Sequence, residues 1–211
     1  MRIRKGLVRG LMLTGIGYAL RIPIFRWLTG SFGTYFLVID VLQCIGISLI
    51  LIVCIYLLTR KKTLVFSIIM LCLGTFIFLC EPLYRTYSAE GIPLFFANYV
   101  TKLNGSVFTI FPWFGYMAFG AFIATLFYRY LEKYKFKATI VTGFFVAGIL
   151  LVYQSTNLLY WLSDVIDYHL FLEVANFNYL FIRLGNVFVI FGLFYAFEAY
   201  LKQPVVLKIG Q

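Results

Sequence analysis

Long apolar runs, separated by short charged loops, constrain the fold of this chain more than any other feature. Five runs come close to the roughly 20 residues that a helix needs to cross a bilayer; they lie at residues 35–59, 63–80, about 107–128, 138–162 and about 179–201. A weaker run, from about residue 6 to residue 22, contains Arg9 and ends at Pro23. Because the runs are continuous rather than alternating, they exclude a porin-like barrel. We expect an all-α, polytopic transmembrane helical bundle of about six membrane-spanning helices, forming one transmembrane domain over residues 1–211.

The composition excludes a soluble fold and argues against a nucleic-acid partner. Hydrophobic residues make up 63% of the chain and charged residues only 12%, too few to solvate the surface of a soluble protein. The formal net charge is +10, but most Lys and Arg residues lie in short loops between the runs, where they set membrane orientation. The four cysteines lie in or beside apolar runs without the spacing of metal ligands, so we expect no metal.

The alternation of loop charge predicts the orientation of the chain. The N-terminus, the 60–62 loop, the 129–137 loop and the C-terminus are basic. The opposite loops hold three basic residues, Arg26, Arg85 and Lys102, against five acidic ones. Since basic loops stay on the cytoplasmic side, we expect an integral protein of the plasma membrane, the inner membrane of a bacterium, with both termini in the cytoplasm.

Polar residues at membrane depth are candidates for function, because they are expensive to insert. Asp40 and Gln43 lie three residues apart and so share a helix face near the outer end of the second run. Arg183 and Asn186 share a face near the outer end of the last run, at about the same depth, and Arg21 closes the first run on the same side. We expect Asp40 and Arg183 to pair or to share a substrate group. The alternatives are structural: an Asp at a helix N-terminus with Gln bonded to a neighbouring helix, and an Arg in a salt bridge.

The chain has one histidine and no self-contained catalytic motif. His169 lies near Asp164 and Asp167, where it is a candidate general base; the alternative is a solvated acidic turn. Arg9 can extend to the cytoplasmic interface. No nucleophile elbow, phosphate-binding glycine loop or zinc-ligand pattern is present in the sequence.

The stretch from Phe111 to Ala121 combines Pro112 and Trp113 with small residues at Gly115, Ala118, Gly120 and Ala121. Pro suits the first turn of a helix, and Trp favours the membrane–water interface. The spacing of the small residues predicts a groove that admits another helix or an acyl chain.

Three blocks of the sequence resemble the heparan-α-glucosaminide N-acetyltransferase-like family of membrane acyltransferases. The first joins Arg4-Lys-Gly-Leu-Val-Arg-Gly10 to Val41-Leu-Gln-Cys-Ile-Gly46, where Cys44 stands in place of a basic residue. The second is Phe111-Pro-Trp-Phe-Gly-Tyr-Met-Ala-Phe-Gly120, and the third is Arg183-Leu-Gly185. The resemblance implies acetyl transfer across the membrane, from cytoplasmic acetyl-CoA to a sugar or a cell-envelope glycan on the outer side.

For an acyltransferase of this kind, the polar and small residues singled out above are the candidates for its sites. We expect Asp40, Arg183 and His169 in catalysis, Gln43, Arg21, Trp113 and Asn186 at the acceptor, and Arg9, Gly115 and Gly120 at acetyl-CoA. The family's histidine belongs to a helix that precedes the basic helix at residue 4, and His169 does not match it. We therefore expect the chain to be the C-terminal portion of a larger acyltransferase-type bundle.

Two other functions stay open at the level of the sequence. The chain could be a non-catalytic membrane subunit or scaffold, with the small-residue groove holding a partner helix or a second copy of the chain. It could also be a small-molecule transporter, although no internal repeat supports alternating access.

Overall fold

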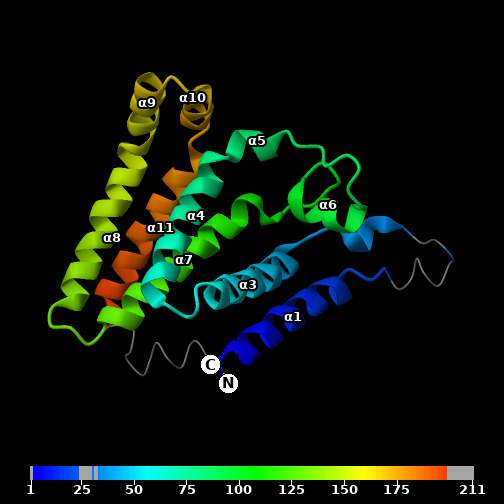
Figure 1. Ribbon diagram of the computed structural model, residues 1–211, viewed down its shortest axis with the longest axis horizontal. Helices are drawn as coiled ribbons and strands as arrows, with labels where there is room; N and C mark the ends of the chain where they lie inside the picture. Colours follow the sequence, from blue (N-terminus) through cyan, green and yellow to red (C-terminus); the bar gives the residue numbers. More distant parts are fainter. Residues whose placement is uncertain (1, 24–29, 31–32, 199–211) are drawn as a thin grey trace. The chain divides into compact units, whose positions relative to one another are not determined.

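The computed structural model describes residues 2–23, 30 and 33–198, and in this part of the chain all regular secondary structure is helical (Figure 1). This confirms the all-α expectation. Four helices are long and apolar enough to cross a bilayer: α3 (Val41–Leu58), α7 (Ile110–Tyr130), α8 (Phe136–Tyr153) and α11 (Tyr179–Ala196). Helix α4 (Thr63–Leu79) is also apolar but has 17 residues. Together with α1 (Arg2–Leu20), they agree with the expected number of about six.

Two of the apolar runs are divided where polar side chains offer the backbone other partners. The 35–59 run begins as a 3-10 turn, η1 (Thr34–Leu37), and α3 starts only after Asp40. The 138–162 run breaks at Gln154 into α8 and α9 (Ser155–Ile166). Hydropathy averaged over a run does not reveal either break, because apolar residues continue within a few positions on both sides.

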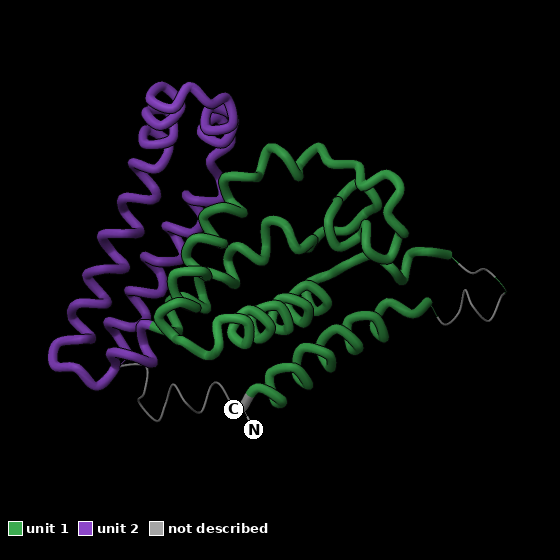
Figure 2. The backbone as a smooth tube through the Cα atoms, in the orientation of Figure 1, with its two compact units in different colours: residues 1–125 green, residues 126–211 purple. Residues whose placement is uncertain are grey.

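The described part of the first compact unit, residues 1–125, contains α1, η1, α3, α4, two short helices, α5 and α6, and most of α7 (Figure 2). Helices α1 and α3 lie side by side (Figure 1) and approach through glycines: a Cβ added at Gly10 would lie 2.8 Å from the carbonyl oxygen of Gly46. Helix α7 meets α4 in the same way, since a Cβ at Gly115 would lie 2.6 Å from the Phe78 ring. Such close approach of backbones is how membrane helices gain packing without help from water.

The loop between α4 and α7 contains two short helices, α5 (Glu81–Arg85) and α6 (Leu94–Val100). Helix α6 lies against η1, where Nδ2 of the fully buried Asn98 donates to the Leu37 carbonyl over 2.9 Å. This loop thereby covers the end of the unit at which α3 begins.

The second compact unit, residues 126–211, pairs α8 with α11 and carries a hairpin of α9 and α10 (His169–Asn176) (Figure 2). Gly148 and Gly185 face each other, because a Cβ at either residue would lie within 2.8 Å of the other's carbonyl oxygen. The hairpin is anchored by Asn178, whose Nδ2 donates to Ser155 Oγ over 2.6 Å. The expected acidic loop is therefore largely helical.

Candidate functional site

The start of α3 is a capping box that brings Asp40 and Gln43 together. Asp40 is the N-cap residue, and its Oδ1 accepts from the Val41 N–H over 2.9 Å. Its carboxylate also accepts from the Gln43 N–H, and Gln43 Oε1 accepts in return from the Asp40 N–H over 3.2 Å. The expected shared face of these two residues thus takes the form of a reciprocal cap, which satisfies N–H groups that the helix itself leaves open. Gln43 bonds to the Asp40 backbone through this cap.

Arg21 joins this cap from the end of α1. Its Nη2 donates to Asp40 Oδ2 over 3.0 Å, and its Cζ lies 5.1 Å from the centroid of the Tyr35 ring. The Arg21 side chain is 16% exposed and the Asp40 side chain 48%. The outer cluster, as we call Arg21, Asp40 and Gln43, therefore joins two helices near the expected outer ends of both.

The bond from Arg21, followed by that from Val41, holds the pKa of the Asp40 carboxyl below its usual range. A carboxylate that accepts several hydrogen bonds in its charged form is a weak proton acceptor. The geometry therefore gives Asp40 a means to orient Arg21 and Gln43, and makes it poorly suited to abstract a proton at neutral pH.

Several donors around the outer cluster are buried and unused. Nε and Nη1 of Arg21, Nε2 of Gln43 and Nε1 of Trp113 have no hydrogen-bond partner among the described residues. Gln43 is fully buried, and its side chain lies directly against Gly17 of α1. Buried donors in native structures nearly always find a partner in the protein, in ordered water or in a ligand, so these atoms are candidate ligand contacts.

Aromatic side chains of α1, α6 and α7 pack next to the outer cluster. The Tyr18 hydroxyl, one turn before Arg21 on α1, donates to the Tyr99 hydroxyl of α6 over 2.8 Å. Tyr99 packs with Cys44 of α3, and Trp113 of α7 lies against the same group. Burial raises the pKa of Tyr99, so its hydroxyl stays protonated and can donate.

Sequence reasoning did not single out Tyr18, Tyr99 or Asn98. Tyr18 stands three residues before Arg21 and so shares its helix face, a signal that could have found it. No local signal could have found Tyr99, because its partner lies 81 residues away in the chain.

Three predicted site residues lie in the second unit, which is described separately from the outer cluster. The Arg183 guanidinium stacks over the Tyr179 ring at 5.2 Å, and Asn186 is exposed. His169 opens α10 with a 77% exposed side chain, and its Nδ1 lies 3.5 Å from Glu173 Oε1. The pairing of Asp40 with Arg183 stays a prediction.

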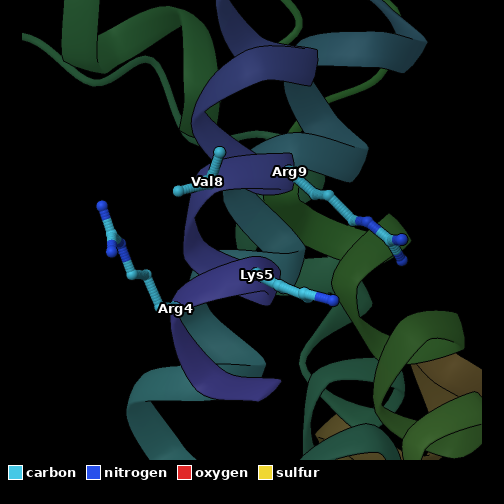
Figure 3. A pocket seen from close by; sticks show the side chains of 4 residues that line it. All are labelled: Arg4, Lys5, Val8 and Arg9. Carbon is cyan, nitrogen blue, oxygen red and sulfur yellow. The ribbon is translucent and has the colours of Figure 1, made fainter. Parts of the chain in front are cut away.

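The other end of α1 is basic. Arg4, Lys5, Val8 and Arg9 line an open hollow in which Lys5 and Arg9 extend to one side of the helix and Arg4 to the other (Figure 3). None of the described residues that line this hollow is acidic, so it suits phosphate groups. Two glycines were expected at acetyl-CoA. The Phe78 ring occupies the space beside Gly115, whereas the space beside Gly120 is open.

The family model for the heparan-alpha-glucosaminide N-acetyltransferase, catalytic, matches residues 1–166. The chain belongs to this family. The matched residues include the outer cluster, Trp113 and the basic hollow, and they end before His169, Arg183 and Asn186. Membership and the apolar helices make the chain an integral membrane protein of an acetyltransferase family. Searches of curated proteins and of solved structures find no match.

Proposed function

We propose that the chain takes part in acetyl transfer from cytoplasmic acetyl-CoA to a sugar or a cell-envelope glycan on the outer side of the plasma membrane. The observation that carries this proposal is the presence of two polar sites at opposite ends of α1, both within the family match. At the helical rise per residue, Arg4 and Arg21 lie about 25 Å apart, close to the thickness of a bilayer core.

At the basic end, Lys5 and Arg9 are the residues that suit the phosphates of acetyl-CoA, with Arg4 on the other side of the helix. Positive side chains without acidic neighbours raise the local concentration of an anionic substrate. When bound, acetyl-CoA supplies the activated acetyl group. Gly120, with open space beside it, is a further candidate contact for the donor.

At the outer end, Arg21, Gln43 and Trp113 offer free donors to the acceptor, and Asp40 holds the first two in place. We therefore assign Asp40 a positioning role. His169, Arg183 and Asn186 of the second unit are candidates for the proton transfer and for further acceptor contacts.

The scaffold alternative has less support. It requires the small-residue groove of α7 to admit a helix from another chain, and at Gly115 this groove holds Phe78 of α4 from the same chain.

The test is complementation of a deletion strain. Cells that lack the gene receive the wild type, Arg21→Ala or the control Arg129→Ala, which removes an exposed charge outside both polar sites. Acetyl groups on envelope saccharides are then measured by mass spectrometry. We expect wild type and Arg129→Ala to restore acetylation and Arg21→Ala to reduce it at least tenfold. Equal acetylation in the deletion strain and the complemented strain would contradict the proposal.

A further inference from the structure

The outer cluster holds more free donors than free acceptors. Three donor atoms, Nε and Nη1 of Arg21 and Nε2 of Gln43, are buried without a partner among the described residues. Tyr18 donates its hydroxyl proton to the Tyr99 hydroxyl, so the Tyr99 hydroxyl proton is available for another acceptor. Among the fully buried acceptors described near the cluster, Oδ1 of Asn98 has no partner, and the Nδ2 of the same side chain donates to the Leu37 carbonyl.

The carboxylate of Asp40 already accepts hydrogen bonds from groups of the protein. Its oxygens accept from two backbone N–H groups of α3 and from Arg21. A ligand hydroxyl would bring its own proton, for which the cluster has little acceptor capacity left. A group with several oxygens and no proton uses the free donors without this conflict.

Two features favour an anionic oxygen at the same place, and the Asp40 carboxylate, 3.0 Å from Arg21, offsets part of their positive charge. The N-terminus of α3 carries a positive partial charge, and Arg21 offers charged donors, which form the stronger hydrogen bonds to anions. Arg21 and Gln43 are also held in position before any ligand arrives, by Asp40 on one side and by Tyr35 or Gly17 on the other.

Resting on the function proposed above, we propose that the outer cluster recognises its acceptor through an anionic oxygen group, a carboxylate or a phosphate, bound by Arg21 and Gln43 at the N-terminus of α3. The acceptor class is therefore an acidic sugar or a sugar phosphate rather than a neutral sugar.

The test compares three sugars that share a ring: glucuronate, glucose 6-phosphate and glucose. Their dissociation constants for the full chain in detergent are measured by equilibrium dialysis, without acetyl-CoA. We expect one of the two anionic sugars to bind at least tenfold more tightly than glucose, and the better of the two identifies the group. Equal binding of glucose would overturn the inference.

Two variants separate recognition from structural support. Arg21→Lys keeps the charge but loses the planar donors, so it should weaken binding of the anionic sugar about tenfold, as for the loss of one hydrogen bond to a charged group. Asp40→Asn removes a negative charge but leaves the Arg21 donors, so it should tighten binding. Shifts in the same direction would overturn the inference, because a merely structural effect weakens binding in both variants.

Gln43→Glu provides a further check that does not depend on Arg21. This variant keeps an oxygen that accepts from the Asp40 N–H and replaces the free Nε2 donor by an acceptor, so it should weaken anion binding. Unchanged binding would show that Gln43 does not contact the anion. Thermal unfolding confirms that each variant is folded. Anion binding without acetyl transfer would refute the proposed function alone, and acetyl transfer to neutral sugars alone would refute this inference alone.

Discussion

At the scale of single residues, Asp40 is the group on which the outer cluster depends. It accepts from the backbone of α3 and from Arg21, and so links the cap of one helix to the end of another. The positioning role that we propose for Asp40 rests on these bonds rather than on its reactivity, because a carboxylate held in its charged form is a weak base.

The ion pair of Asp40 should make stability depend on pH. The folded pKa lies below the ordinary value of 3.8, so the stabilisation is complete above that value and is lost as pH falls through the folded pKa. Asp40→Asn keeps the cap, since Asn is a good N-cap residue, but loses the ion pair. Because the Asp40 side chain is 48% exposed, the cost should be below about 1 kcal/mol.

Thermal unfolding of the purified protein between pH 7 and pH 3 measures this cost. We expect a constant gap between wild type and Asp40→Asn above the ordinary Asp pKa, and a shrinking gap below it. Asp164→Asn, at a carboxylate without an ion pair among the described residues, serves as control. A gap that persists undiminished in acid would show that the ion pair is not its source.

At the scale of elements, the packing of α1 on α3 decides whether the outer cluster exists. A Cβ at Gly46 would lie 2.6 Å from the Gly10 carbonyl oxygen and 2.8 Å from the Thr14 nitrogen, both backbone atoms that cannot move without the helix. Gly46→Ala should therefore push α1 away and destabilise the protein by about 1–3 kcal/mol, the usual cost of overpacking.

Gly15→Ala is the matched control for Gly46→Ala, because Gly15 is an exposed glycine of α1 with nothing within 4 Å of its added Cβ. It should leave the melting temperature unchanged or raise it slightly, since Ala is the better helix former. Equal effects of the two substitutions would contradict close α1–α3 packing.

The second unit offers the same experiment on different helices. Gly148→Ala would place a Cβ 2.8 Å from the Gly185 carbonyl oxygen, and Gly143→Ala would place one in open space on the same helix. We expect the first substitution to lower the melting temperature and the second to have little effect. Insensitivity to Gly148→Ala would mean that α8 and α11 do not pack through this contact.

At the scale of the whole molecule, the sequence predicts the helices better than it predicts the site. Hydropathy locates every long helix because a bilayer demands continuous apolar runs. It misses the start of α3 at the Asp40 cap, and it misses the break at Gln154, next to which Ser155 Oγ donates to the Leu151 carbonyl.

The sequence predicts the candidate site only where its residues lie close together along the chain. The spacing of Asp40 and Gln43 indicates a shared face, and Arg21 was expected on the same side. The contact of Tyr18 with Tyr99 depends on how the loop between α4 and α7 places α6 beside Tyr18, and no short stretch of sequence indicates that placement.

The orientation of the chain is the property of the whole molecule that the proposed function most requires, since the proposal places the donor and acceptor sites on opposite sides of the membrane. The basic α7–α8 hairpin predicts a cytoplasmic position for Lys133, and the α6–α7 loop predicts an outer position for Lys102. Each is changed to Cys in a background without the native cysteines and treated in intact cells with a membrane-impermeant maleimide. We expect Lys102→Cys to react and Lys133→Cys to react only after the membrane is permeabilised. The reverse pattern would place the outer cluster in the cytoplasm and leave the proposed direction of acetyl transfer without support.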